Sequence, residues 1–266
     1  MESLPFTSLL GSLKEEGGIF SAPVTEDWLQ GRTLFGGMGA ALCLEAARRR
    51  AGRERPLRSM IVSYVAPVSP DAPVTLEPVI LREGRNVTQV MTTLTQNGQV
   101  ATVANFCFAQ DFESTLDSQD ITLPEGKSRQ DSFDFHSLGR GPVFLQHFDV
   151  LWANDVFPMT GAVKGESLVW VRHKDGIEGA EETAFVALAD ALPPSAMAML
   201  KKPAPLSTMT WQLNIIDPSF TTDDGWWLTH ARTQHVANGY ASQEATFWNT
   251  EGKLAAIGTQ NILIFG

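Results

Sequence analysis

Residues 58–67, with the sequence RSMIVSYVAP, are matched in the second half of the chain by residues 209–218, MTWQLNIIDP. A second match follows, because residues 88–98 (TQVMTTLTQNG) resemble residues 242–252 (SQEATFWNTEG). The paired positions differ by 151 in the first match and by 154 in the second. A nearly constant offset over strand-like segments predicts a duplicated fold unit, which can place a functional site between its two copies.

The pattern around these segments is one helix followed by consecutive strands, and it occurs twice. In the first half a short strand at 18–24 precedes a helix at 38–47, and strands are predicted at 58–66, 73–83, 86–96 and 99–109. In the second half a strand at 166–173 precedes a helix at 181–192, and strands are predicted at 207–217, 226–236, 240–249 and 253–264. Asn97-Gly98 is a strong hairpin signal between two of them.

This order predicts an α+β fold rather than a parallel α/β fold. We expect an N-terminal unit at residues 1–110, a linker at 111–140 that is polar and has few regular signals, and a C-terminal unit at 141–266. A single antiparallel sheet would leave an edge exposed, so we expect the two units to pack together.

Composition limits the classes of partner. The net charge of −10 argues against nucleic acid or an anionic membrane as the main partner. No apolar run approaches the ~20 residues that a membrane span needs, and no secretory leader follows Met1. Cys43 and Cys107 lie in apolar stretches, as expected for buried free thiols in a reducing compartment. We therefore expect a cytoplasmic protein without membrane insertion.

A glycine pair opens the first helix. Residues 31–37 (GRTLFGG) lead directly into it, so free N–H groups and the positive end of the helix dipole could hold an anion or polarise a carbonyl oxygen. Alternatively, Gly36 and Gly37 only allow tight packing of the helix on the sheet. The second helix begins instead with Glu181-Glu182, whose charges would repel an anionic ligand. This asymmetry favours one working site rather than two.

Asp190 is unusual for its position in the second helix. It shares the apolar face of Val186 and Ala187, and it lies near the helix C-terminus, where the dipole disfavours an anion. Either it has a partner or a function, or it faces solvent and begins the turn at Pro193-Pro194.

Polar residues also replace apolar ones at matched positions of the repeat. Gln260 stands in a mostly apolar strand where the first copy has Phe106, and it is either bound by backbone groups or catalytic. Thr208 corresponds to Leu57, and alternation along a strand predicts that Thr208 and Thr210 share one face. Threonine is common in strands, so a structural role is the alternative for each threonine.

Other motifs of catalysis are missing from the sequence. His230 and His235 lie in one strand-like stretch without a visible partner for base catalysis. No Cys/His metal cluster, Gly-x-Ser-x-Gly elbow, dinucleotide fingerprint or phosphate loop occurs. We therefore expect no metal and no cofactor.

Several of these segments together resemble a known family, the double-hotdog acyl-CoA thioesterases of the thioesterase-II-like group. The resemblance spans most of the chain apart from 110–140, and its motifs lie at residues 31–37, 63–67, 96–99, 188–190, 207–210 and 252–260. It implies two fused hotdog units, each a long helix wrapped by an antiparallel sheet. It also implies hydrolysis of an acyl-CoA thioester by water, without metal, cofactor or covalent intermediate.

Matching the family motifs residue by residue assigns the water-activating trio to Asp190, Thr208 and Gln260. Phe35, Gly36 and Gly37 are implied as the substrate-binding helix start, where N–H groups polarise the thioester carbonyl. The family's aspartate two positions after its threonine is replaced by Thr210, and its glutamine after the glycine pair is replaced by Met38.

We therefore expect an acyl-CoA thioesterase that acts on an acyl-CoA substrate, with no nucleic-acid partner. The family likeness also suggests association into a homo-oligomer. The altered strand around Thr210 keeps open a catalytically impaired protein that only binds acyl-CoA or lipid. A hotdog hydratase is less favoured, because no Asp/His pair for dehydration is evident.

Overall fold

The computed structural model describes residues 3–139 and 141–265. Its first half contributes α1 (Phe6–Gly11), β1 (Lys14–Glu16), β2 (Ile19–Ala22), β3 (Leu29–Gln30), β4 (Thr33–Leu34), α2 (Gly36–Ala51), β5 (Leu57–Tyr64), β6 (Val74–Glu83), β7 (Val87–Gln96) and β8 (Gln99–Ala109). Its second half contributes β9 (Phe133–Asp134), β10 (Phe148–Trp152), β11 (Glu166–His173), α3 (Glu181–Ala189), β12 (Leu206–Ile215), β13 (Trp227–Ala237), β14 (Tyr240–Trp248) and β15 (Leu254–Ile264). Short 3-10 turns include η3 (Val143–His147) and η4 (Ser195–Met199).

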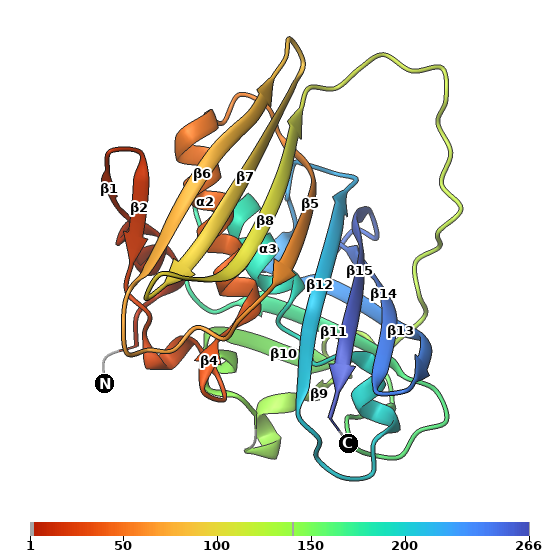
Figure 1. Ribbon diagram of the computed structural model, residues 1–266. Helices are drawn as coiled ribbons and strands as arrows, with labels where there is room; N and C mark the ends of the chain where they lie inside the picture. Colours follow the sequence, from red (N-terminus) through yellow and green to blue (C-terminus); the bar gives the residue numbers. More distant parts are fainter. Residues whose placement is uncertain (1–2, 140, 266) are drawn as a thin grey trace.

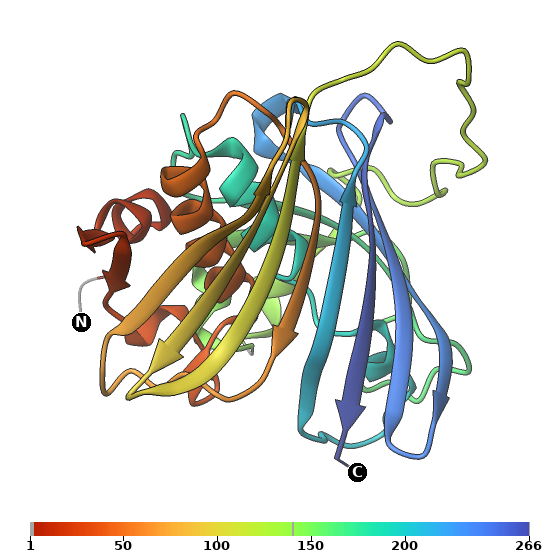
Figure 2. The ribbon, with the colours of Figure 1, turned by 45° about the horizontal axis from the view of Figure 1, so that its top comes forward.

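Apart from β3 and β4, which pair with each other, the strands of the two halves form one continuous antiparallel sheet. Among the described residues its order is β1-β2-β6-β7-β8-β5-β12-β15-β14-β13-β11-β10-β9. The two halves meet where β5 pairs with β12, and Figure 2 shows the orange and yellow strands of the first half beside the blue strands of the second. The predicted packing of the two copies is therefore an edge-to-edge strand pairing, which removes an exposed edge from each.

The junction has the symmetry of the sequence repeat. Ile61 and Gln212 are equivalent positions of the two copies, and they lie directly opposite each other in the β5–β12 pair. On either side of the junction the strands follow in the same order, β5-β8-β7-β6-β2 and β12-β15-β14-β13-β11. The duplication therefore corresponds to a pseudo-twofold arrangement whose axis passes between Ile61 and Gln212.

Helices α2 and α3 lie on the same side of this sheet, which curves around them (Figure 1). The residues of α2 from Gly37 to Arg48 are buried, because the helix packs on β6, β7, β8 and α3. In β7 every second residue is buried, as expected for a strand with one face on the core. The predicted α+β fold, two helices each wrapped by an antiparallel sheet, is confirmed.

The predicted elements agree with the structure in order, and most differ by one to three residues at their ends. Asn97 and Gly98 have φ values of 52° and 77°, which fits the predicted hairpin turn. The second helix is shorter than expected, because it ends at Ala189 and leaves Asp190 as its C-terminal cap. The short elements α1, β1, β3, β4, β9 and β10 were not predicted from the sequence.

The segment predicted as a linker runs outside the two units as an extended loop after β8 (Figure 1). It is not without structure, because β9 within it pairs with β10. The limits of the two units stay a prediction. Cys43 and Cys107 are both free thiols; Cys43 is buried and Cys107 half-buried.

Candidate active site

The two helices run antiparallel, so the start of α2 meets the end of α3. A Cβ atom on Gly37 would lie 2.5 Å from the backbone oxygen of Ala187 in α3, so this glycine permits close helix packing. A Cβ atom on Gly36 would lie 2.8 Å from Oδ2 of Asp190. Gly37 thus permits close packing and Gly36 leaves room beside the Asp190 carboxylate. Binding of an anion or a carbonyl oxygen at this helix start stays a prediction.

Asp190 is half-buried and not exposed to solvent, as the alternative would require. Its carboxylate is enclosed by protein, accepts a hydrogen bond from the N–H of Gly37, and accepts another from Nε2 of Gln260 at 2.8 Å. Burial raises the pKa of Asp190 to about 7, against the lowering effect of these two hydrogen bonds. A carboxyl group with this pKa can take up a proton near neutral pH, as a general base requires.

Gln260 is held by a series of hydrogen bonds between side chains that were not predicted from the sequence. Its Oε1 accepts a hydrogen bond from Nε2 of Gln243, the residue opposite it on β14. Oε1 of Gln243 accepts from the N–H and the hydroxyl of Ser195, at 2.9 and 3.1 Å, and the Ser195 hydroxyl contacts that of Thr233 at 2.8 Å. These hydrogen bonds fix the orientation of the Gln260 amide, so that its NH₂ group points to Asp190.

Thr208 lies on β12, which pairs with the strand of Gln260. On β15 its partner is Ile262, two residues from Gln260, so both side chains point to the concave face. The prediction that Thr208 and Thr210 share a face is wrong, because a β-bulge interrupts the register between them. Thr210 pairs with Asn261 and is exposed on the other face. The Thr208 hydroxyl makes no hydrogen bond within the described ranges.

Phe35 precedes the glycine pair and is fully buried. Its ring stacks on that of Phe144, with ring centroids 3.9 Å apart, and its N–H donates to the carbonyl of Trp28 at 2.9 Å. Its carbonyl accepts from the N–H groups of Met38 and Gly39, both at 3.1 Å. The side chain therefore anchors the start of α2, and a direct contact with substrate stays a prediction.

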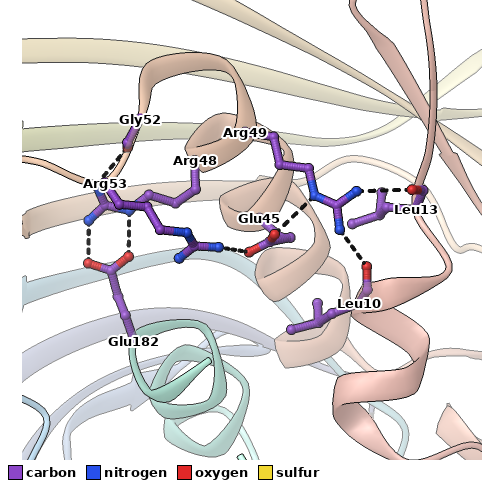
Figure 3. Close-up of polar contacts among 8 residues, drawn as sticks. All are labelled: Leu10, Leu13, Glu45, Arg48, Arg49, Gly52, Arg53 and Glu182. Atoms are coloured by element: carbon purple, nitrogen blue, oxygen red, sulfur yellow. Dashed lines mark hydrogen bonds and ion pairs between the residues drawn. The ribbon is translucent and has the colours of Figure 1, made fainter. Parts of the chain in front are cut away.

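At the opposite end of the helix pair, the start of α3 meets the end of α2 and an ion pair fills the equivalent space (Figure 3). Nε of Arg48 donates to Oε2 of Glu182 at 2.6 Å, and Nη2 of Arg48 donates to Oε1. Oε1 also accepts from the N–H of Leu57, the repeat partner of Thr208, at 3.0 Å. The Arg48 guanidinium lies 4.0 Å from the ring centroid of Phe108.

This ion pair joins the end of α2 to the start of α3. The carboxylate of Glu182 is therefore not free, unlike that of Asp190 at the other end of the helix pair. The neighbouring cations are also paired, because Arg49 and Arg53 both bind Glu45 (Figure 3). The expected asymmetry between the two copies is therefore present in the structure. One end of the helix pair carries an enclosed carboxylate beside glycines, and the other is closed by Arg48 and Glu182.

Two cavities lie between α3 and the sheet. The smaller, about 20 Å³, borders Gln260, Gln243, Trp211 and Phe247, and a cavity of this size can hold one water molecule. The larger, about 280 Å³, lies beside Phe185, Leu188, Phe220, Trp227 and His173. Phe185 packs against Phe247 with ring centroids 5.6 Å apart, so these two rings stand between the cavities.

The histidines of the sequence analysis take no part in this site. Nε2 of His230 contacts Oε1 of Glu166 at 2.7 Å, and His235 is exposed. His147 contacts Oδ2 of Asp27 at 3.0 Å, a pair that the sequence did not reveal. Within residues 3–139 and 141–265 no group of three or more His, Cys, Asp or Glu side chains could hold a metal ion.

None of the helices in these ranges has the length and hydrophobicity that crossing a bilayer requires.

Comparisons with known proteins agree with this architecture. A family model described as the acyl-CoA thioesterase N-terminal domain matches residues 24–109, and one described as the acyl-CoA thioesterase C-terminal domain matches residues 118–264. A search of curated protein sequences finds no significant match.

Solved structures with the same fold cover nearly the whole chain. A hot dog fold protein of unknown function from Alicyclobacillus acidocaldarius has a TM-score of 0.87 and 24% identity, with 98% of each chain covered. The tesB protein of Mycobacterium avium subs paratuberculosis (0.81, 18%) and the acyl-CoA thioesterase II TesB2 of Mycobacterium marinum (0.79, 17%) also match, again with 98% of each chain covered.

Proposed function

The chain belongs to the acyl-CoA thioesterase family, and from this membership we propose that it hydrolyses acyl-CoA thioesters with Asp190 as the general base. The observation that carries the proposal is the enclosed carboxylate of Asp190, which Gln260 binds at 2.8 Å beside the start of α2. Its pKa of about 7 suits a base that works near neutral pH. The family and the fold support thioester hydrolysis in general, and the assignment of the residues is our proposal.

In the proposed reaction Asp190 removes a proton from a water molecule as its oxygen attacks the thioester carbonyl carbon. The carbonyl oxygen becomes an oxyanion, which the free N–H group at the start of α2 helps to stabilise. When the intermediate collapses, the C–S bond breaks and the proton on Asp190 passes to the departing sulfur. The products are a carboxylic acid and free coenzyme A, and the Asp190 carboxylate is restored.

Gln260 and Thr208 orient the water in this proposal. The Gln260 amide already binds Oδ1 of Asp190, and Gln243 fixes its orientation. Thr208 projects from the same face of the sheet and its hydroxyl is available to a water molecule or a substrate. Position and orientation of the attacking water reduce the entropic cost of the reaction.

The test is a series of acyl-CoA substrates of increasing chain length, with the released thiol detected by its reaction with a chromogenic disulfide. Wild type should release coenzyme A from at least one chain length, and both Asp190→Asn and Gln260→Ala should be slower. Unchanged rates in both variants would exclude the proposed site.

A second candidate is a protein that binds acyl-CoA or lipid without turnover. It is favoured by the exposed Thr210 in place of an aspartate and by the cavity of about 280 Å³ with Phe185, Phe220 and Trp227 in its walls. Calorimetry with an acyl-CoA separates the two functions. Tight binding without thiol release supports the binding protein, and thiol release supports the hydrolase.

A further inference from the structure

Tyr64 brings an unused hydrogen-bond donor to the proposed site. It is the last residue of β5, its ring packs against the core, and its hydroxyl is fully buried without a hydrogen-bond partner in the described part of the chain. The ring carbon Cζ and the hydroxyl oxygen both lie 3.2 Å from the point where a Cβ atom on Gly36 would be. Oδ2 of Asp190 lies 2.8 Å from the same point. Tyr64 and Asp190 therefore border one small space beside Gly36.

A buried hydroxyl without a partner is unfavourable, at a cost of about 1–3 kcal/mol. Such a group in a folded protein suggests that something else binds it during function. Burial, and then the nearby Asp190 charge, raise the pKa of Tyr64 well above its ordinary value. The hydroxyl therefore keeps its proton and acts as a neutral donor.

The number of free donors at the helix start also points to Tyr64. Gly37 donates its N–H to Asp190, and the N–H groups of Met38 and Gly39 both donate to the carbonyl of Phe35. The N–H of Gly36 has no acceptor in residues 3–139 and 141–265. A single N–H is a weak oxyanion site, because such sites commonly combine two or more donors. The Tyr64 hydroxyl, next to Gly36, would supply the second donor.

The repeat supports a functional origin for this tyrosine. Its equivalent in the second copy is Ile215, which has no polar atom in its side chain. The end of the helix pair that Arg48 and Glu182 close thus lacks the hydroxyl, as it lacks equivalents of Thr208 and Gln260. Tyr64 is therefore the contribution of the first copy to the same asymmetry.

We propose that the Tyr64 hydroxyl and the Gly36 N–H together donate hydrogen bonds to the carbonyl oxygen of the bound thioester and to the oxyanion that forms from it. The inference rests on the proposed function and names a further residue that touches the substrate. Tyr64 transfers no proton, so Asp190 remains the only group that gains and loses one.

The variant Tyr64→Phe keeps the ring and removes only the donor. The chain has two tyrosines, and Tyr240 is 48% exposed on β14, so Tyr240→Phe is the matched control. We expect kcat to fall about 100-fold in Tyr64→Phe and to stay unchanged in the control. Because an unpartnered hydroxyl is lost, the melting temperature of Tyr64→Phe should be unchanged or higher. A structural role would instead lower it.

Two unreactive ligands test the contact with the carbonyl itself. A ketone analogue of acyl-CoA, with methylene in place of sulfur, keeps the carbonyl, whereas an S-alkyl thioether of coenzyme A lacks it. Calorimetry should show the ketone binding about tenfold more weakly to Tyr64→Phe than to wild type, and the thioether binding equally to both.

The outcomes separate this inference from the proposed function. Suppose that wild type hydrolyses thioesters, and that Tyr64→Phe has the same kcat and binds the ketone equally well. This result overturns the role of Tyr64 and leaves the proposed function in place. Equal weakening of both ligands also overturns the role of Tyr64, because the effect would then not depend on the carbonyl. Wild type that neither hydrolyses a thioester nor binds the ketone overturns both proposals.

Discussion

Gln260 and Asp190 are 70 residues apart in the chain, and their side chains are joined by a hydrogen bond of 2.8 Å. The bond links the middle of β15 to the end of α3, so it depends on how the C-terminal helix sits on its own sheet. Because the amide NH₂ donates to the carboxylate, it stabilises the charged form of Asp190 and lowers its pKa.

Removal of this bond should move the pH dependence of catalysis. In Gln260→Ala the pKa of Asp190 should rise above about 7, because burial remains and one stabilising hydrogen bond is lost. The base works in its deprotonated form, so the rise of kcat/KM with pH should shift to higher pH, together with a lower plateau. Gln212→Ala, on the exposed face of β12, is the control and should leave the profile in place. An unshifted profile in Gln260→Ala would contradict the role of this bond.

The two glycines at the start of α2 should respond differently to alanine. Gly36→Ala directs a methyl group at Oδ2 of Asp190, a movable side chain, so we expect at least a tenfold loss of kcat with little loss of stability. Gly37→Ala directs it at the backbone oxygen of Ala187, so we expect about 1–3 kcal/mol lower stability from overpacking. In Gly39→Ala the nearest atom is 4.0 Å away, and this control should be tolerated. Denaturation curves and rates measured on the same preparations check all three variants.

The ion pair at the other end of the helices should matter for stability and not for catalysis. Glu182→Ala leaves the Arg48 guanidinium buried without its partner, so we expect a loss of about 3–5 kcal/mol in the free energy of unfolding. Glu181→Ala removes an exposed neighbour whose carboxylate accepts a hydrogen bond from the N–H of Gly179, and it should change stability little. The kcat of folded Glu182→Ala, measured well below its melting temperature, should match wild type. A stable variant with a large loss of kcat would show that this end of the helix pair takes part in catalysis.

Much of the fold could be predicted from the repeat, because alternating strand patterns and the Asn97-Gly98 turn are local signals. The pairing of Ile61 with Gln212 is the structural form of the repeat offset. The edge-to-edge joining of the sheets could not be predicted, since it depends on which strand edges remain free after each copy folds.

The site was only partly predictable for a similar reason. Asp190 and Gln260 were noticeable as polar residues in apolar patterns, and the structure brings them together. Gln243 had no such signal, because a glutamine in a strand is unremarkable until the register places it opposite Gln260. The bulge that turns Thr208 away from the face of Thr210 is likewise a property of strand pairing.

Asp190 should also affect stability in a pH-dependent way. Its pKa rises from 3.8 in the unfolded chain to about 7 in the folded protein, so its contribution to stability is fully present below pH 4 and is lost as the pH rises through 7. At pH 8 the buried charge thus costs about 4 kcal/mol, at 1.36 kcal/mol per pKa unit. Asp190→Asn carries no charge and should melt at a higher temperature than wild type at pH 8. The difference should shrink towards pH 4, and a difference independent of pH would contradict the raised pKa.

The central claim is that Asp190 removes the proton from the attacking water. The most direct measurement is the single-turnover rate of thioester hydrolysis at pH 8 for wild type and Asp190→Asn, with enzyme in excess over an acyl-CoA that wild type cleaves. The variant keeps the shape of the side chain and loses the base, so the rate should fall about 10³-fold. A rate within about threefold of wild type, in a folded variant, would contradict the account.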